Sequence, residues 1–329
     1  MNSFGRIFRV SVFGESHGEC VGVGIDGMPP GIALRADDFV TDIERRKPGA
    51  IGTTPRKEDD IPEILTGLFE GKTTGAPITI IFRNNNTRSA DYKKREIPRP
   101  GHADFIASKK FNGFEDYRGG GHFSGRLTVT LVAAGVVAKK ILNNYSAPVS
   151  VHAKLVEAGG ESDIDKGIQK AIDAKDSIGG IVECVVDGLP LALGEPFFDS
   201  VESVISHAVF AIPAIRGIEF GTGFAAAKMF GSEHNDPLES VDGKTSTNHA
   251  GGVVGGLTNG NPLIFRIAVK PTSSTPKEQK TLNLESGQAE SFTVKGRHDL
   301  CIALRVPVVL EAVTALVLAD LLLIHKRPE

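Results

Sequence analysis

The chain has 329 residues, of which 40% are hydrophobic, and its formal net charge at pH 7 is −3. This composition supports a folded core, and the near balance of charge gives no electrostatic reason to expect a nucleic acid or a membrane as partner. The cysteines, Cys20, Cys184 and Cys301, lie far apart with no CxxC pair, which argues against a disulfide framework and a cysteine-rich zinc site. The first 13 residues lack the pattern of a signal peptide, so we expect a cytoplasmic protein with reduced thiols.

The chain begins with two predicted strands. Residues 7–13 alternate in hydrophobicity, and a polar loop with the sequence Gly-Glu-Ser-His-Gly follows at 14–18. Residues 21–28 form the second predicted strand, and their glycines match G-x-G-x-x-G. We reject a dinucleotide site here, because that motif must open a helix and two prolines and a glycine follow instead.

The next segment is basic. Residues 37–46 are predicted as a helix ending in Arg45 and Arg46, and the basic loop 47–57 is long enough to form a lid or the wall of a site. Strands are predicted at 61–69 and 78–82, paired around a turn. The polar segment that follows ends in Arg-Pro-Gly-His-Ala-Asp at 99–104, where a helix begins.

Residues 117–135 combine a glycine turn with an apolar helix. Three consecutive glycines, 119–121, contribute nothing to a core, and they suit a sharp turn or a close approach to a ligand. Ser124 is predicted to cap the helix. Ser124 and Arg126 would then lie at a helix N-terminus, which favours anions. Taken alone, the pattern is explained more simply by a turn, a cap and a solvated arginine.

The second half of the chain has a more ordinary pattern. Strands are predicted at 149–158, 180–186 and 263–270, helices at 162–176, 199–210 and 306–324, and a polar loop at 231–236. The last helix is long enough to span a bilayer, but Pro307, Glu311 and Asp320 favour a core or subunit-interface helix. No repeat or clear linker is present, so we expect one domain over residues 1–329.

Several polar residues are candidates for chemistry. His17 and His102 are candidate acid–base groups, because each lies beside glycine in a polar loop; the alternative is a solvated histidine. Lys270 and the hydroxyl-rich residues after it suit a phosphate monoester, although a loop after an edge strand has the same composition. No segment has the spacing of metal ligands, so we expect no metal.

Arg297 and Asp299 are two residues apart and would point the same way on an extended segment. One could bind an anionic substrate while the other accepts a proton, or the two could form a structural ion pair. A substrate with several negative charges could be met by the arginines Arg45, Arg46, Arg99, Arg126 and Arg297.

Five of these segments, in this order between residues 14 and 299, together resemble the chorismate synthase family. They are residues 14–18, 99–104, 117–135, 270–274 and 296–299. The resemblance implies an α+β fold, a β-α-β sandwich with helices between antiparallel sheets, assembled as a homotetramer. It also implies a reaction, the 1,4-anti-elimination of phosphate from 5-enolpyruvylshikimate 3-phosphate to give chorismate. This is the last common step of the shikimate pathway to the aromatic amino acids, and it requires reduced FMN.

The resemblance also implies roles for individual residues. The catalytic residues would be His17, which acts at the departing phosphate, His102, which supplies a proton to the flavin, and Asp299, which assists removal of the C6 proton. The substrate would be bound by Ser16, Arg99, Ser124, Arg126 and Arg297. The flavin would be bound by Ser124, Gly125, Arg126, Gly255, Lys270, Pro271, Thr272, Ser273, Ser274 and Arg297. Of the nicotinamide contacts proposed for the family, the resemblance implies only one here, at Arg46.

The sequence departs from the family pattern in two places. His122 stands where many members have arginine, and the loop after Arg46 has Lys47 and residues 50–52 where arginines are common. The segment 143–180 is short and the fungal insertions are absent. We therefore expect a monofunctional enzyme that receives reduced FMN from an external flavin reductase and uses NADPH only indirectly. The alternatives are a phosphate-ester lyase or hydrolase without flavin and a non-catalytic binder of flavin or phosphometabolites.

Overall fold

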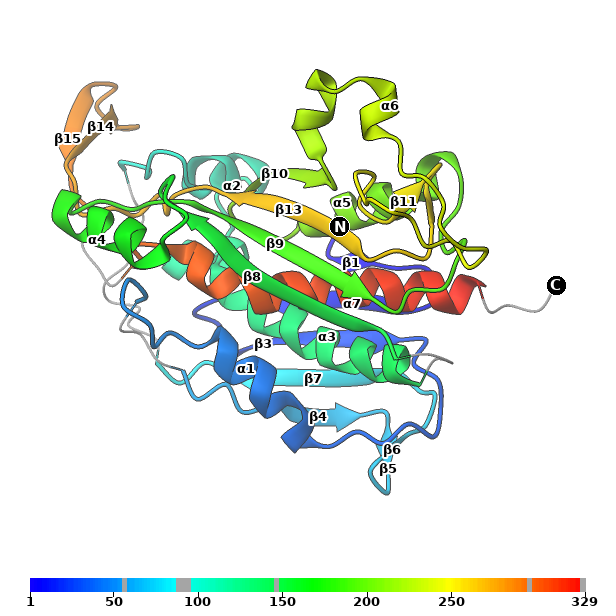
Figure 1. Ribbon diagram of the computed structural model, residues 1–329. Coiled ribbons are helices and arrows are strands. Elements are labelled where there is room, and N and C mark those ends of the chain that lie inside the picture. The colour runs from blue at the N-terminus through cyan, green and yellow to red at the C-terminus, as the bar shows by residue number, and fades with distance from the viewer. Residues whose placement is uncertain (55–57, 87–95, 145–147, 295–297, 326–329) are drawn as a thin grey trace.

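Two antiparallel sheets enclose a layer of helices (Figure 1). The chain is described from a computed structural model, which places residues 1–54, 58–86, 96–144, 148–294 and 298–325. The first sheet has the order β1 (Ser3–Phe4), β2 (Arg9–Gly14), β3 (Cys20–Asp26), β7 (Ile78–Arg83), β4 (Glu63–Thr66). The second has the order β10 (Ile215–Phe220), β13 (Leu263–Val269), β9 (Gly180–Asp187), β8 (Ser150–Ala158). The predicted β-α-β sandwich is confirmed.

Two long helices fill the space between the sheets. Helix α3 (Thr128–Asn143) packs on β3 and β7 of the first sheet, and α7 (Val306–His325) packs on β8 and β9 of the second. The helices also pack on each other, and a Cβ atom added at Gly135 of α3 would lie 2.3 Å from the Cβ of Ala312 in α7. Residues 302–325 are long and apolar enough to cross a membrane, but 83% of their most apolar 18-residue window is buried in the fold. A helix that is apolar on all sides is typical of a buried core element, so the predicted core helix is confirmed.

The acidic residues of α7 bind groups from distant parts of the chain. Both terminal nitrogens of Arg45 donate to Glu311 at 2.7 Å, and Lys139 lies 3.4 Å from the same carboxylate. Asp320 accepts the backbone N–H groups of residues 6, 7 and 8 at 2.7–2.9 Å. Buried carboxylates are tolerated when they are paired in this way, and these two join α7 to helix α1 (Val40–Arg46) and to the N-terminal segment.

The remaining helices and strands lie around the two sheets and helices α3 and α7. They are η1 (Ala36–Phe39), β5 (Leu68–Phe69), β6 (Lys72–Thr73), α2 (Asp104–Lys110), η3 (Arg118–Phe123), η4 (Gly125–Leu127), α4 (Ile164–Ala174), η5 (Phe197–Asp199), α5 (Val201–Val209), η6 (Gly223–Lys228), α6 (Gly231–His234), β11 (Val253–Val254), β12 (Leu257–Thr258), β14 (Gln279–Leu282), β15 (Ala289–Phe292) and η7 (Ile302–Arg305). Most predicted elements are present with ends shifted by a few residues. The single strand predicted at 61–69 was wrong, because β4 pairs with β7 in the first sheet whereas β5 pairs with β6 in a separate hairpin. The prediction of a loop at 231–236 was wrong, because the one-turn helix α6 lies there. Strand β10 and the hairpin β14–β15 were not predicted.

Candidate active site

The three glycines before α3 form a turn that only glycine can make. Their φ angles are +59°, +85° and +52°, in the region that disfavours side chains. A Cβ atom on Gly119 would lie 2.6 Å from the ring of His17, and one on Gly121 would lie 2.0 Å from the backbone oxygen of Asp116. The turn therefore brings the loop of His17 against the beginning of α3.

The loop at 14–18 is held against this turn. The Ser16 amide donates to the Gly121 carbonyl at 3.1 Å, and the Asn84 side chain donates to the carbonyls of Glu15 and Gly18 at 3.0 and 2.9 Å. Ser16 is fully buried, and its hydroxyl oxygen has no hydrogen-bond partner within the described part of the chain. A buried polar atom without a partner is costly, and this hydroxyl lies directly behind Gly119 of the glycine turn.

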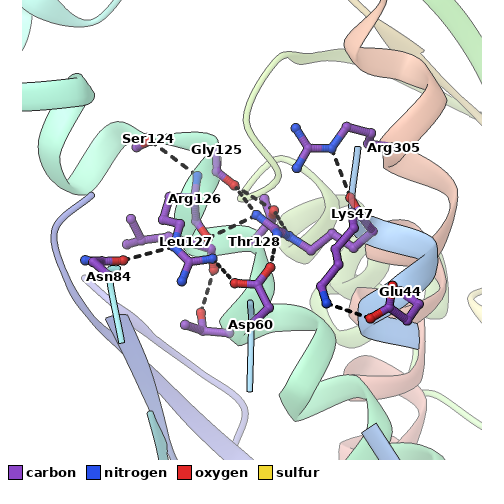
Figure 2. Close-up of polar contacts among 12 residues, drawn as sticks. Glu44, Lys47, Asp60, Asn84, Ser124, Gly125, Arg126, Leu127, Thr128 and Arg305 are labelled. Atoms are coloured by element: carbon purple, nitrogen blue, oxygen red, sulfur yellow. Dashed lines mark hydrogen bonds and ion pairs between the residues drawn. The ribbon is translucent and has the colours of Figure 1, made fainter. Parts of the chain in front are cut away.

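Ser124 caps the helical segment as predicted, since its side chain accepts the Arg126 amide at 3.3 Å. The Arg126 side chain does not extend into solvent. It forms an ion pair with Asp60 and donates to the Asn84 side chain at 3.0 Å (Figure 2). Asp60 is 5% exposed and also pairs with Arg46 at 3.1 Å. One buried carboxylate thus positions two arginines at the start of α3.

Arg46 is bound entirely by the protein. Its guanidinium donates to the Thr128 hydroxyl at 2.9 Å and to the carbonyls of Gly125 and Arg126 at 3.2 Å, besides its bond to Asp60. Burial lowers the pKa of Arg46 to about 9, and the nearby charge of Arg305 acts in the same direction. Arg46 therefore remains charged at neutral pH and fixes the backbone at residues 125 and 126.

The second predicted histidine lies in a separate charged cluster. Nδ1 of His102 lies 2.6 Å from Asp104, which also accepts two bonds of 2.7 Å from Arg99. Burial would raise the pKa of Asp104, but the bonds from Arg99 and His102 outweigh burial and hold it well below its usual range. Because this carboxylate stays ionised, it accepts a hydrogen bond from Nδ1–H of His102. Nε2 of His102 then faces the glycine turn at Gly120.

Asp299 lies in the loop before η7 and is held by two other parts of the chain. One of its oxygens accepts the Thr54 amide at 2.9 Å, and the other lies 3.3 Å from a terminal nitrogen of Arg305. Arg305 in turn donates from Nε to the backbone oxygen of Arg46 at 2.9 Å. The loop before α7 is thereby joined to the end of α1.

The predicted phosphate-binding loop packs beside His102. Lys270 donates to the Gly101 carbonyl at 2.7 Å and to the Ser273 hydroxyl at 2.9 Å, and Arg99 donates to Ser274 at 3.0 Å. Burial lowers the pKa of Lys270, with a further contribution from Arg216. The Thr272 hydroxyl is buried without a partner among the residues described. These ammonium and hydroxyl groups are the donors that a phosphate monoester requires.

Two adjoining cavities join these clusters. The smaller cavity has a volume of about 220 Å³. Its charged lining residues in the described chain are Arg46, Arg99, Arg126, Arg305, Glu58, Asp60 and Asp299. Four arginines against three carboxylates leave one excess positive charge. A larger cavity of about 630 Å³ lies beside it and shares Ser124, Gly125 and Thr272 with it. The larger one has mainly apolar walls, with residues 270–274 and His102 at its side. A charged chamber beside an apolar one suits an anionic substrate beside a planar cofactor.

The structure brings most of the predicted site residues together. The small cavity is lined by Arg46, Arg99, Ser124, Gly125, Arg126, Thr272 and Asp299, and the large one by His102, Lys270, Pro271, Ser273 and Ser274. Ser16 and His17 lie behind Gly119, which itself lines the small cavity. Gly255 is exposed in the β11–β12 turn and lines neither cavity, while Arg297 lies outside the described residues.

Sequence reasoning missed Asp60, Asn84 and Arg305. The only signal for Asp60 was its place in an acidic run after the basic loop. His122, which was left undecided, holds the first loop through a contact of 2.9 Å with the Gly14 carbonyl. Within the described ranges, no three His, Cys, Asp or Glu side chains gather as a metal site.

Comparisons with known proteins agree in one family. A family model described as chorismate synthase matches residues 8–323. A chorismate synthase of Chitinophaga pinensis is 70% identical over 328 residues, covering 99% of this chain and 98% of that protein. A chorismate synthase of Dehalococcoides mccartyi is 44% identical over 98% of this chain and 96% of its own. A crystal structure of chorismate synthase aligns with a TM-score of 0.74 and 25% identity, covering 98% and 93% of the two chains.

Proposed function

Because the chain belongs to the chorismate synthase family of carbon–oxygen lyases, we propose that it converts 5-enolpyruvylshikimate 3-phosphate to chorismate. The reaction is the 1,4-anti-elimination of phosphate and requires reduced FMN. The observation that carries the proposal is the pair of adjoining cavities, one lined by arginines and one mainly apolar beside Lys270.

The charged cavity suits the substrate, which carries two carboxylates and a phosphate. Arginine charge attracts both kinds of group. Arg99 and Arg126 line the cavity and contribute their charge and the few N–H groups that Asp104, Ser274, Asp60 and Asn84 leave free. Ser124 and the unpartnered hydroxyl of Ser16 add neutral donors. In our proposal Arg297 completes this set.

The apolar cavity suits FMN. Lys270, Thr272 and Ser273 supply an ammonium and hydroxyls for its phosphate, and the Thr272 hydroxyl has no partner in the described chain. Residues 124–126, Pro271, Ser274 and Arg297 would hold the rest, and Gly255 would reach it from another copy of the chain. Reduced flavin bound there would supply electron density for breaking the C–O bond and would recover it when the C6 hydrogen leaves.

Three residues handle protons in this proposal. His17 donates a hydrogen bond or proton to the departing phosphate, beside the glycine turn. In its protonated form, His102 would keep Nδ1–H on Asp104 and could give the proton on Nε2 to a bound flavin. Asp299 assists removal of the C6 proton. Variants His17→Ala and His102→Ala that bind FMN and keep full turnover would remove these assignments.

We also propose a cellular setting for the enzyme. It acts in the cytoplasm in the shikimate pathway, as a homotetramer, without nucleic acid or membrane partners. An external reductase supplies reduced FMN, so NADPH acts only indirectly and Arg46 has no direct role with it. The engagement of every Arg46 nitrogen within the protein supports this view.

The test is anaerobic turnover followed by chorismate absorbance. One reaction contains dithionite-reduced FMN and a parallel one contains oxidised FMN with NADPH. We expect chorismate only with the pre-reduced flavin. Chorismate in both would show an intrinsic flavin reductase activity, and chorismate in neither, from folded protein, would overturn the proposed function.

A further inference from the structure

The arginines of the small cavity differ in how many donors they have left. Every side-chain nitrogen of Arg46 and of Arg126 already donates to Asp60, Thr128, Asn84 or a backbone carbonyl. Arg99 is bound in the same way, at Nε and Nη2 by Asp104 and at Nη1 by Ser274. These guanidiniums are positioned by the protein and have few hydrogens free for a ligand.

Arg305 is different. Its Nε donates to the Arg46 carbonyl at 2.9 Å and Nη1 lies 3.3 Å from Asp299, which anchors the side chain. Its Nη2 has no hydrogen-bond partner within the described ranges, although Arg305 lines the cavity. In Figure 2 its terminal nitrogens point to the side where Ser124 and Gly125 lie. The side chain is 20% exposed, so an anion here would be only partly hydrated.

We propose that Arg305 is an anion-binding residue of the active site and contacts a substrate oxyanion through Nη2 and the second hydrogen of Nη1. Its bond to Asp299 places that carboxylate beside the same substrate. An anion bound at Arg305 also offsets the repulsion between Arg305 and Arg46, which contributes to the lowered pKa of Arg46. This proposal rests on the proposed function for the identity of the substrate, but not for the presence of an anion site.

The test compares Arg305→Gln and Arg305→Lys with the control Arg266→Gln. Arg266 pairs with Glu219 on the surface of the second sheet at 3.0 Å and lies outside both cavities. We expect KM for 5-enolpyruvylshikimate 3-phosphate to rise about 10- to 100-fold in Arg305→Gln, because a charged hydrogen bond is lost. The lysine variant should recover part of this loss, and Arg266→Gln should leave KM unchanged.

Two competitive inhibitors identify the group that is bound. Inorganic phosphate and shikimate, which carries the ring carboxylate without phosphate, are titrated against wild type and Arg305→Gln. A raised Ki for either one assigns that group, and a raised KM with both Ki values unchanged assigns the enolpyruvyl carboxylate. Unchanged KM and Ki values with a lowered kcat would overturn the proposal, because Arg305 would then act only by positioning Asp299.

Calorimetric titration of the flavin-free protein with phosphate separates this inference from the proposed function. If wild type makes no chorismate, but Arg305→Gln weakens phosphate binding, the anion site stands and the proposed reaction fails. If wild type makes chorismate, and the variant retains wild-type KM, Ki values and phosphate affinity, the reaction stands and the anion site fails.

Discussion

At the scale of single residues, Arg46 and Arg126 at the start of α3 are positioned by Asp60, a partner far from Arg126 in sequence. Arg126 was predicted from its place at a helix N-terminus, and it does lie there. Its pairing with Asp60, a residue with a φ of +52°, could not be predicted, because it depends on how a loop before β4 packs against α3. Arg305 was missed because its anchor at Nε, the Arg46 carbonyl, comes from the distant helix α1.

Asp104 gives a pH-dependent prediction. Its folded pKa lies below the value of about 3.9 for an unfolded aspartate. A carboxylate with a lowered pKa stabilises the fold fully above the unfolded pKa and loses that contribution as the pH falls toward the folded value. Asp104→Asn should therefore destabilise the protein by about 2 kcal/mol at pH 7, because charged hydrogen bonds from Arg99 and His102 are weakened.

The measurement is urea denaturation of both proteins between pH 7 and pH 3. We expect the difference in unfolding free energy to stay constant down to about pH 5 and to shrink below about pH 4. The control is Asp187→Asn, an exposed residue at the end of β9. A difference between wild type and Asp104→Asn that persists unchanged at pH 3 would contradict the ionic origin of the effect.

At the scale of elements, periodicity predicted the helices and strands that have a buried face. β9 and β13 alternate along their length, and β8 alternates up to its register shift after Leu155; all three lie close to their predicted positions. β10 was not predicted, since it includes Gly217 and a register shift. The hairpin β14–β15 has no buried residue in either strand, so its sequence lacks the alternation that marks a core strand.

The contact between α3 and α7 gives the second prediction. A side chain at Gly135 would meet Ala312 Cβ at 2.3 Å and its Cα at 2.5 Å, both on a rigid helix. Gly135→Ala should therefore destabilise the protein by about 1–3 kcal/mol through overpacking, despite the better helix propensity of alanine. Thermal unfolding measures the change. Gly24→Ala on β3, where a Cβ meets no atom within 4 Å, is the control and should keep the wild-type midpoint.

An unchanged midpoint of thermal unfolding in Gly135→Ala would mean that α3 and α7 can move apart without loss of stability. A lowered midpoint with retained anion binding would show that the contact serves the core alone. Because α3 begins at the site and α7 follows Arg305, we expect both the midpoint and phosphate affinity to fall.

At the scale of the whole molecule, one cluster of buried hydrophobic side chains runs through both sheets and the helices between them. This continuity supports our proposal that residues 1–329 form one domain. It also explains why composition could predict a core but not the layers. The sandwich was predicted from the resemblance to a family, whereas the order of strands depends on pairings between residues more than 50 positions apart, such as β3 with β7.

The proposed homotetramer gives the last prediction, because the surface exposes large apolar side chains. Phe114, Phe197 and Phe198 are among them, and two more lie in a segment that stands out from the sheet. Between β10 and β11, Phe224 is 83% exposed and Phe230 is 77% exposed. In Figure 1 this segment, with α6, projects beyond the second sheet, on the side away from the β5–β6 hairpin. Exposed apolar groups of this size typically mark a protein interface, and we assign them to contacts between copies of the chain.

The double variant Phe224→Ser/Phe230→Ser should therefore shift the mass in solution from four chains toward two or one, measured by size-exclusion chromatography with light scattering. Its matched control is Phe69→Ser, which removes a phenylalanine that is 70% exposed on the opposite hairpin. Dissociation in the double variant alone would locate the interface on this segment. If the double variant stays tetrameric, the interface lies elsewhere, and if wild type is already monomeric at micromolar concentration, the tetramer itself is wrong.

Because Gly255 lies in the hairpin that follows this segment and lines neither cavity of its own chain, we also expect the dissociated variant to bind FMN more weakly than wild type.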